Sequence, residues 1–399
     1  MRAFGCPRCG QLVYFENVEC LRCRAGLGFD PESREMVRVA NDGDAGDGAG
    51  ATPDPSDAGD AGEAAPDPSG GGDHGGGAAQ VLPAAVRCAN RFLAGCNWVL
   101  PRPQPGALCR SCRLTRTRPS DTDLARVPDV TRRFVRAEAA KRRLVFQLLE
   151  LRLPLVSRHE DPAWGLAFDF LVKQAEPITI GHADGVITID LAESDDAYRE
   201  RMRVQLGEPY RTMLGHLRHE VGHYYWQVIV SGNTDELEGF RRLFGDERAD
   251  YQQALERHYE QGPAPGWAEE HVSIYAAAHP WEDWAETWAH YLHIRDTLQT
   301  AASHGVIVTG PHFGHRPVAT RSGRGLDPSL TAAPSLKSPQ DLDEILADWL
   351  PLTYALNAIN RSMGRDPLYP FVLSRKVIER LRFVHDQVLH GRGSPVQRA

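Results

Sequence analysis

Cysteine is missing from most of this chain. All eight cysteines lie between Cys6 and Cys112, and the remaining 287 residues contain none. A secreted protein that depends on disulfides would not usually leave its largest part without them. The distribution instead favours a metal-binding cysteine module joined to a cysteine-free domain.

Long apolar runs are also missing. The first ten residues hold few apolar side chains and already contain two cysteines, whereas a secretory signal needs an apolar run of about 7–15 residues. No stretch reaches the roughly 18 apolar residues of a membrane span. We therefore expect a soluble, cytoplasmic protein with no membrane partner, in a compartment where thiols stay reduced.

Lysine and arginine are absent from residues 40–80, which hold nine acidic residues among Gly, Ala, Pro and Ser. Such a composition buries too little apolar surface to offset the conformational entropy of the chain, so we expect a disordered acidic Gly/Asp/Pro linker over 38–84. The net charge of −8 becomes +1 once these nine acids are set aside. A nearly neutral remainder argues against a general polyanion binder and against nucleic acid as the partner.

The 399 residues, of which 42% are hydrophobic, suffice for a sizeable core and two or three domains. We expect a zinc ribbon over 1–37, the linker over 38–84 and a second cysteine segment over 85–118. A larger domain should follow over 131–392.

Apolar periodicity predicts that helices dominate the larger domain. Expected helices cover 131–153, 209–230, 240–261, 281–298, 340–362 and 374–390. Two short strands, 178–180 and 186–189, flank a turn over 181–185, and a long loop is expected over 299–338. This combination predicts the α+β class, mostly helical with a small β-sheet.

The cysteines are spaced for structural zinc. Cys6 with Cys9 and Cys20 with Cys23 form two CxxC turns, each of which points two thiolates at one centre. The second group consists of Cys88, Cys96, Cys109 and Cys112. Only Cys109 and Cys112 have the CxxC spacing. Two sequential four-cysteine sites are the simplest pairing, although an interleaved pairing stays open. Four-thiolate sites are closed, so the two zinc ions would be structural.

A HEXXH pattern runs from His219 to His223 within the helix expected over 209–230. Side chains at i and i+4 share one helical face, so both imidazoles reach one zinc ion. Glu220 is then placed to take a proton from a zinc-activated water, as in metallopeptidases. Gly222 costs about 1 kcal/mol in a helix interior, which suggests a close backbone approach. His216 shares this face and is expected to be satisfied locally or to face solvent.

A third zinc ligand is expected on the helix over 281–298. There, Glu282, Glu286, His290 and His293 fall on one face, and Trp281, Trp284, Trp288 and Leu292 form the apolar face. Buried carboxylates beside an aromatic stripe are expensive unless a cation is present. Spacing alone does not separate Glu282 from Glu286. The acids of residues 244–251 are a rival, interpreted instead as the start of a helix that Asp246 caps and whose dipole Glu247 favours.

Other polar groups favour ordinary structural roles. Tyr224, Tyr225 and Tyr291 are interpreted as packing residues, and His312 and His315 as loop residues. A basic helix face is interpreted as solvated rather than as a nucleic-acid surface; it consists of Arg132, Arg133, Lys141, Arg142 and Arg143.

The H-E-V-G-H segment with the later E-x-W-A-E-x-W-A resembles the gluzincin metallopeptidases. The chain as a whole, apart from residues 40–80, resembles a bacterial family of zinc-binding metallopeptidases that carry an N-terminal double zinc ribbon. The segments that carry this resemblance are C-P-x-C-G-Q, H-E-V-G-H-Y-Y-W and H-P-W-E-D-W-A-E-T-W-A-H-Y-L-H.

The resemblance implies a zincin-like fold and a peptidase with one catalytic and two structural zinc ions. In the gluzincin pattern the ligand is the first Glu, with Ala at +3 and an acid at +4, which assigns Glu282 as the third ligand. Glu286 would then accept a hydrogen bond from a zinc-bound imidazole. The expected substrate is a peptide or protein. The alternative is a non-catalytic zinc-ribbon protein that docks a nucleic acid or a protein.

Overall fold

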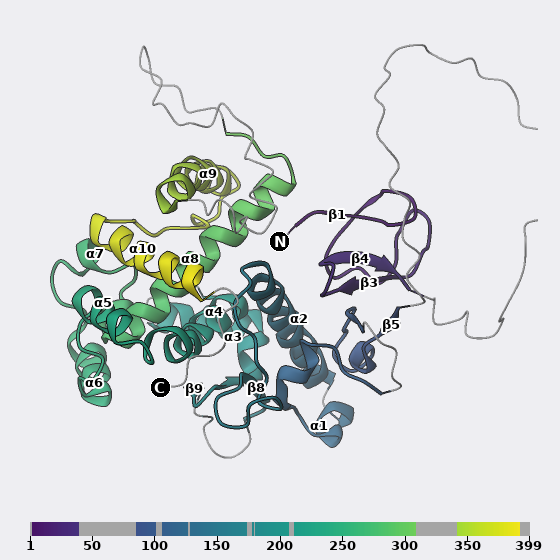
Figure 1. The fold of residues 1–399 in the computed structure, drawn as a ribbon, viewed down its shortest axis with the longest axis horizontal. Helices are drawn as coiled ribbons and strands as arrows, with labels where there is room; N and C mark the ends of the chain where they lie inside the picture. Colours follow the sequence, from purple (N-terminus) through teal and green to yellow (C-terminus); the bar gives the residue numbers. More distant parts are fainter. Residues whose placement is uncertain are drawn as a thin grey trace, which may run out of the picture.

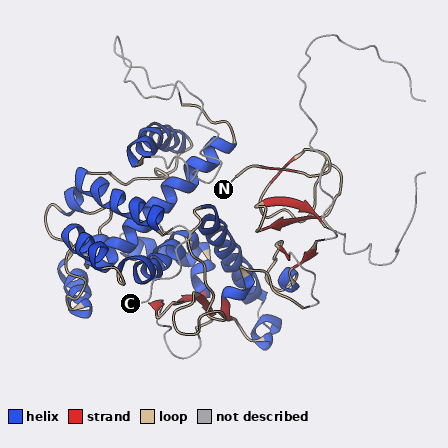
Figure 2. Ribbon diagram, in the orientation of Figure 1, coloured by secondary structure: helices blue, strands red, loops and turns tan. Residues whose placement is uncertain are grey.

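The protein folds into a small β-rich module that carries both cysteine groups and a larger, mostly helical domain (Figure 1, Figure 2). The structure is a computed structural model that describes residues 2–39, 85–100, 106–126, 128–173, 178, 180–206, 211–308 and 341–391. The fold class is α+β, as the sequence predicts. No helix in these ranges combines the length and the apolar composition that spanning a bilayer requires.

The cysteine module is built from three antiparallel two-stranded ribbons. They are β1 (Phe4–Gly5) with β2 (Leu12–Val13), β3 (Leu27–Asp30) with β4 (Glu35–Arg38), and β5 (Val86–Arg87) with β6 (Val99–Leu100). Short 3₁₀ turns, η1 (Ala89–Arg91) and η2 (Cys112–Leu114), lie in the second cysteine segment. Bridges pair Phe29 with Trp98 and Val39 with Ala85, so the two cysteine segments form one body.

An aromatic cluster joins this module to the helical domain. Phe146 on α2 (Pro128–Glu150) lies 5.1 Å from Phe15 and 5.4 Å from Phe29, measured between ring centroids. Phe29 in turn packs 5.0 Å from Trp98 in the second cysteine segment. The aromatic rings are fully buried, and such pairs add stability beyond their buried area. The long helix α2 therefore serves as the support on which the cysteine module rests.

A four-stranded sheet lies on the other side of α2, with the strand order β7-β8-β10-β9. Its members are β7 (Thr115–Thr117), β8 (Ala167–Leu171), β9 (Gly181–Ala183) and β10 (Val186–Asp190). The β7–β8 and β8–β10 pairs are parallel, and β9 runs antiparallel to β10 at the edge. The predicted second cysteine segment thus contributes β7 to the sheet of the larger domain.

The predicted hairpin forms, but its first strand lies further along the chain than expected. β9 begins at Gly181 rather than at Ile178, and the turn consists of Asp184 and Gly185 alone. Both turn residues have positive φ, 48° and 82°. A two-residue Asp-Gly turn of this kind matches the twist of the paired strands, which is why the shorter turn forms.

The HEXXH helix begins at Met213, not at Pro209. Thr212 caps it by accepting a hydrogen bond from the Gly215 amide, and α4 (Met213–Tyr225) continues into a π-helical turn, η4 (Trp226–Val230). The helix predicted over 240–261 is in fact two helices, α5 (Thr234–Phe244) and α6 (Tyr251–Gln261). Gly245 with φ of 106° ends the first, and Asp250 caps the second.

The helices predicted over 281–298, 340–362 and 374–390 are present as α8 (Pro280–Ser303), α9 (Leu342–Ser362) and α10 (Arg375–His390). The structure also has short helices that were not predicted; they are α1 (Asp121–Arg126), η3 (Leu191–Ser194), α3 (Asp196–Leu206), α7 (Trp267–Glu270) and η5 (Tyr275–Ala277). Residues 299–303, expected in a loop, extend α8. Arg38 and Val39, expected in the linker, belong to the ribbon module. The rest of the predicted linker, over 40–84, and most of the predicted loop, over 309–338, lie outside the described residues.

The helices α4 and α8 meet closely at Gly222. A Cβ atom added there would lie 3.1 Å from the Cα of Ala285 and 3.2 Å from the Cβ of Trp288. The indole of Trp284 donates a hydrogen bond of 2.8 Å to the Gly222 carbonyl and so fixes the register of the two helices. The close approach that the sequence suggested at Gly222 is therefore present.

Gly222→Ala should destabilise the protein by about 1–3 kcal/mol, because the added methyl group overpacks a fully buried helix contact. Gly215→Ala is the matched control, since Gly215 is only half-buried and lies in the first turn of the same helix. There the gain in helix propensity should leave stability unchanged or raise it. Thermal and denaturant unfolding measure both, and equal stability of the two variants would contradict the close contact.

Candidate metal centres

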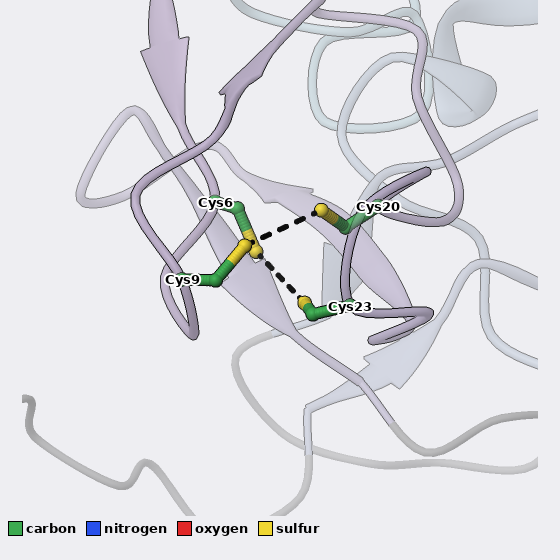
Figure 3. Close-up of side chains that lie close together, drawn as sticks. All are labelled: Cys6, Cys9, Cys20 and Cys23. Carbon is green, nitrogen blue, oxygen red and sulfur yellow. Dashed lines mark hydrogen bonds between the residues drawn. The ribbon is translucent and has the colours of Figure 1, made fainter. Parts of the chain in front are cut away.

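The first four cysteines meet at one point (Figure 3). The Sγ atoms of Cys6 and Cys23 lie 3.6 Å apart, and those of Cys9 and Cys20 lie 3.7 Å apart. Four sulfurs held tetrahedrally about 2.3 Å from a zinc ion would be separated by about 3.8 Å. A disulfide would bring two of them to about 2.05 Å, and all of these cysteines are free. The spacing therefore fits zinc.

The second four cysteines also converge, and all of them are buried. The Sγ atoms of Cys96 and Cys109 lie 3.6 Å apart, and Cys88 Sγ accepts a hydrogen bond of 3.3 Å from the Cys109 amide. The second group also includes Cys112, so each cluster uses four consecutive cysteines of the chain. The structure thus adopts the sequential pairing and not the interleaved one.

A third cluster forms where α4 faces the first turn of α8. His219 and His223 project from one face of α4, and Glu282 projects from α8. Glu282 Oε2 lies 3.0 Å from His219 Nε2 and 3.7 Å from His223 Nε2. One donor atom from each residue falls within 4.8 Å of the other two. Two imidazoles and a carboxylate are the donor set of a catalytic zinc site with an open position.

The two oxygens of Glu282 have different surroundings. Oε1 accepts a hydrogen bond of 2.6 Å from the Tyr251 hydroxyl, whereas Oε2, the atom near both imidazoles, makes no hydrogen bond to any residue that the structure describes. The side chain is almost completely buried, and the two imidazoles hold the pKa of its carboxyl well below its usual range although burial opposes this. A buried, ionised oxygen without a donor is costly unless a cation binds it. The residues therefore fit a metal ion.

Glu286 lies behind His219, on the opposite side of the ring from Glu282. Its Oε1 is 2.7 Å from His219 Nδ1, and its Oε2 accepts a hydrogen bond of 2.6 Å from the Ser273 hydroxyl. A carboxylate bonded to Nδ1 fixes the imidazole tautomer so that Nε2 is free to bind a metal ion. The geometry distinguishes the two glutamates that helical spacing leaves equivalent.

Glu220 is buried beside the cluster and contacts His216. Its Oε1 lies 3.2 Å from His216 Nε2, so His216 is satisfied locally, which is one of its two expected states. Burial raises the pKa of Glu220, but the neighbouring histidines outweigh burial and lower the pKa to about 2. The hydrogen bond with His216 is the largest of these lowering effects. The carboxylate is therefore ionised at neutral pH and is able to accept a proton.

Several residues around the cluster escaped the sequence reasoning. Tyr251 bonds Glu282, the ring of Tyr275 lies 5.8 Å from that of His219, and the ring of His182 stacks 6.2 Å from that of His223. Trp281, expected on the apolar face of α8, instead packs 5.1 Å from His223. Only Tyr251 had a signal in the sequence, since it ends the rival segment over 244–251.

The acids of that rival segment do not reach the cluster. Asp246 pairs with Arg248 and Glu247 pairs with Arg241, while Asp250 caps α6. The capping interpretation was therefore right in kind, but Asp250 caps the helix and not Asp246. Tyr224, Tyr225 and Tyr291 are buried packing residues, as expected, and Tyr225 donates a hydrogen bond to the Pro154 carbonyl. His312 and His315 lie outside the described residues.

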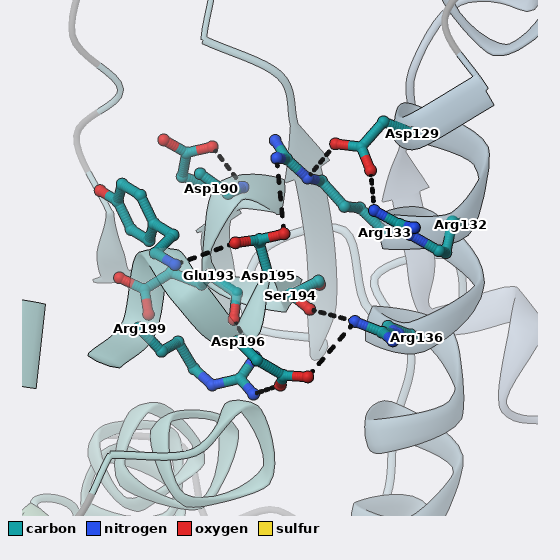
Figure 4. Close-up of polar contacts among 12 residues, drawn as sticks. Asp129, Arg132, Arg133, Arg136, Asp190, Glu193, Ser194, Asp195, Asp196 and Arg199 are labelled. Atoms are coloured by element: carbon teal, nitrogen blue, oxygen red, sulfur yellow. Dashed lines mark hydrogen bonds and ion pairs between the residues drawn. The ribbon is translucent and has the colours of Figure 1, made fainter. Parts of the chain in front are cut away.

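The basic residues of α2 do not form a single exposed face. At its N-terminal end, Arg132 and Arg133 pair with Asp129, and Arg136 reaches Asp196 beyond η3 (Figure 4).

Further along α2, Lys141 is fully buried and pairs with Glu138. Arg142 is also buried and donates to the carbonyls of Ala94 and Gly95, and Arg143 pairs with Glu16. Lys141 and Arg142 therefore hold the fold together, whereas Arg132 and Arg143 are exposed, as the sequence interpretation expected.

Comparison with known proteins places the chain among zinc proteins. A family model described as "Putative zinc-binding metallo-peptidase" matches residues 130–387, and a zinc-ribbon domain model matches residues 3–53 and 77–123. The uncharacterized protein Rv2568c of Mycobacterium tuberculosis (strain ATCC 25618 / H37Rv) is 45% identical over 388 residues, 97% of this chain and 95% of its own length. The uncharacterized protein Mb2598c of Mycobacterium bovis matches equally well. No solved structure matches the chain significantly.

The surroundings of Glu282 and Glu286 predict different losses of zinc. Glu282→Ala should remove the metal expected at the His/Glu cluster, so that the variant holds one zinc ion per chain fewer than the parent. Glu286→Ala should keep that metal but bind it about 10–100-fold more weakly. Elemental analysis after mild chelation measures both. Loss of zinc from Glu286→Ala and not from Glu282→Ala would reverse the two assignments.

Proposed function

Since the chain belongs to the family described as "Putative zinc-binding metallo-peptidase", we propose that it is a zinc-dependent hydrolase of peptide bonds with Glu220 as general base. The observation that carries the proposal is the convergence of His219, His223 and the hydrogen-bond-free oxygen of Glu282 directly beside an ionised Glu220. A structural metal site has no need of such a base. In this proposal His219, His223 and Glu282 hold the catalytic zinc.

Zinc held by two imidazoles and a carboxylate polarises a carbonyl and lowers the pKa of water to about 7. The residues of this chain would supply the proton transfer. One oxygen of Glu220, Oε1, is bonded to His216, which leaves Oε2 to accept the proton. Glu282 is held by Tyr251 and His219 is held by Glu286, so both would keep their orientation throughout the reaction.

The edge strand β9 favours an extended peptide as the substrate. Among the described strands β9 is the last of its sheet, and no described strand pairs with its outer backbone groups, which suits this edge to an added strand. The strand runs past the proposed base, because a Cβ atom on Gly181 would lie 3.9 Å from Glu220 Oε2. A peptide that paired with β9 would therefore pass its main chain alongside Glu220.

His182 on β9 is suited to stabilise developing negative charge. Its Nε2 accepts a hydrogen bond of 3.1 Å from the Gly185 amide, which places the ring proton on Nδ1. Nδ1 makes no hydrogen bond within the described part of the chain. Burial, together with His223, lowers the pKa of His182 to about 4, so the ring is neutral at pH 7 and still offers one N–H donor.

The two cysteine clusters complete the proposal with two structural zinc ions. Four thiolates close the coordination sphere, so neither cluster has a position for a substrate. Reduced cysteines of this kind persist in a reducing compartment, and we therefore propose the cytoplasm as the location. The proposed substrate is a peptide or a protein.

Glu220→Gln tests the proposal. The amide has the size of the carboxylate but accepts no proton, so hydrolysis should fall by about 10²–10⁴-fold while zinc content stays the same. The measurement is cleavage of a mixed peptide library, followed by mass spectrometry, for the parent and the variant side by side. The variant also serves as the control for contaminating peptidases. A parent preparation that cleaves no faster than Glu220→Gln would contradict a peptidase that uses Glu220 as its general base.

His182→Phe should lower kcat by about 100-fold, because the ring stacking on His223 is kept but the N–H donor is lost. KM and zinc content should change little if the donor acts mainly in the transition state. His182→Gln retains an N–H donor and should recover part of the rate. Equal kcat values for the parent and the Phe variant would remove His182 from the mechanism.

A further inference from the structure

A cavity of about 970 Å³ lies away from the His/Glu cluster, where the cysteine module meets the C-terminal end of α2. The β3–β4 turn, strand β6, the loop around Cys109 and the residues after α2 form its walls. Its described lining consists of Pro31, Glu32, Arg34, Val99, Leu100, Ala107, Leu108, Arg110, Arg113, Leu149, Arg152 and Glu160. This volume lies at the upper end of the range for small-molecule pockets and is larger than a single ion needs.

Positive charge prevails on the walls, with four arginines against two glutamates. Arg34 lies 3.5 Å from the buried carboxylate of Glu150, and Arg110 donates to the Leu155 carbonyl. In the described residues, Arg113 and Arg152 have no carboxylate within ion-pair distance. Guanidinium groups that have no carboxylate partner within the protein are suited to bind the carboxylates of a ligand through paired hydrogen bonds.

The backbone at two of these arginines favours glycine. Arg152 follows α2 with φ of 57°; its amide bonds the Leu149 carbonyl and the Leu153 amide bonds the Leu148 carbonyl. This pair of bonds is the helix end that usually takes Gly at the position of Arg152. Arg34 has φ of 60° in the β3–β4 turn. Because a side chain with a Cβ atom is strained there, arginine at both positions lowers stability relative to glycine.

The neutral lining selects among anionic ligands. Pro31, Val99, Leu100, Leu108 and Leu149 supply aliphatic surface, and the described lining contains no aromatic ring on which a nucleic-acid base would stack. Glu32 and Glu160 interrupt the positive field, which disfavours a continuous phosphate backbone. A polypeptide places carboxylates beside the arginines and aliphatic side chains beside the apolar surface. We propose that this cavity binds an acidic segment of a polypeptide.

The proposal is independent of catalysis and is tested by equilibrium binding. The probe is a fluorescein-labelled octapeptide of alternating Glu and Leu, titrated with the full-length, zinc-loaded chain and followed by anisotropy. All proteins carry Glu220→Gln, so that the probe is not hydrolysed. A peptide with Gln in place of every Glu measures how much of the affinity depends on the carboxylates.

Arg152→Gly should weaken binding of the Glu/Leu peptide by about tenfold, since one charge-assisted contact is lost. The same variant should melt at an unchanged or higher temperature, because Gly relieves the strained φ. Arg24→Gly is the matched control. Arg24 also has a positive φ, 59°, but does not line the cavity, and its pairing with Glu19 is exposed to solvent. It should bind the peptide as the parent does.

Arg113→Glu is the second variant and should weaken binding more than Arg152→Gly, because it reverses a charge on the wall. Parent-like affinity in both cavity variants, or equal binding of the Gln peptide, would overturn the proposal. A thymidine oligonucleotide is titrated in parallel. If it binds more tightly than the peptide, is displaced by the peptide and binds Arg113→Glu more weakly than the parent, the cavity selects nucleic acid rather than acidic polypeptide and the proposal is wrong.

Discussion

The close packing of α4 on α8 at Gly222 governs the position of every group in the His/Glu cluster. Without a side chain at Gly222, the two helix backbones approach until a Cβ atom would lie 3.1 Å from Ala285. This brings Glu282, in the first turn of α8, within 3.7 Å of both imidazoles of α4. The same contact places Glu286, one turn further along α8, against the rear of His219. A wider helix separation would leave the carboxylates and the imidazoles in different surroundings.

Burial of so many acids in one region is tolerated because each has its own partner. Asp283, next to Glu282, lies 3.1 Å from Arg380 Nε and 3.0 Å from His271 Nδ1. Glu286 bonds Ser273 and His219, and Glu220 bonds His216. In the described part of the chain, Glu282 Oε2 and Asp283 Oδ1 are both buried without a hydrogen bond, but Asp283 is paired through its other oxygen with Arg380, a cation, whereas Glu282 Oε2 itself faces the Nε2 atoms of His219 and His223. The pattern of satisfied and unsatisfied groups therefore points to one cation at one place.

The cysteine module is attached to the helical domain by both packing and strand pairing. Phe146 on α2 enters its aromatic cluster, and β7, which follows the second cysteine group directly, extends the sheet of the larger domain. Arg110, between Cys109 and Cys112, bonds the Leu155 carbonyl, and Tyr225 at the end of α4 bonds the neighbouring Pro154 carbonyl. The short segment that includes Pro154 and Leu155 thus contacts the ribbon and the HEXXH helix at once. Structural zinc in the module would stabilise one side of this contact.

The sequence alone determined the features that depend on spacing within one element. Imidazoles at i and i+4 share a helical face and CxxC turns converge locally, so the His219–His223 pair and the cysteine turns could be predicted from the chain. The two-residue turn at Asp184 and Gly185 and the break at Gly245 also had local signals, which longer apolar patterns obscured.

Only the tertiary structure decided how these elements meet. Tyr251 reaches Glu282 across 31 positions of the sequence, and Glu286 reaches His219 across 67. The same holds for the sequential pairing of the cysteines, the stacking of His182 on His223 and the pairing of the α2 arginines with acids of other elements. Periodicity fixes which side chains share a face, but it does not fix which face another element covers. That choice follows from the packing of the whole core, here above all from the contact at Gly222.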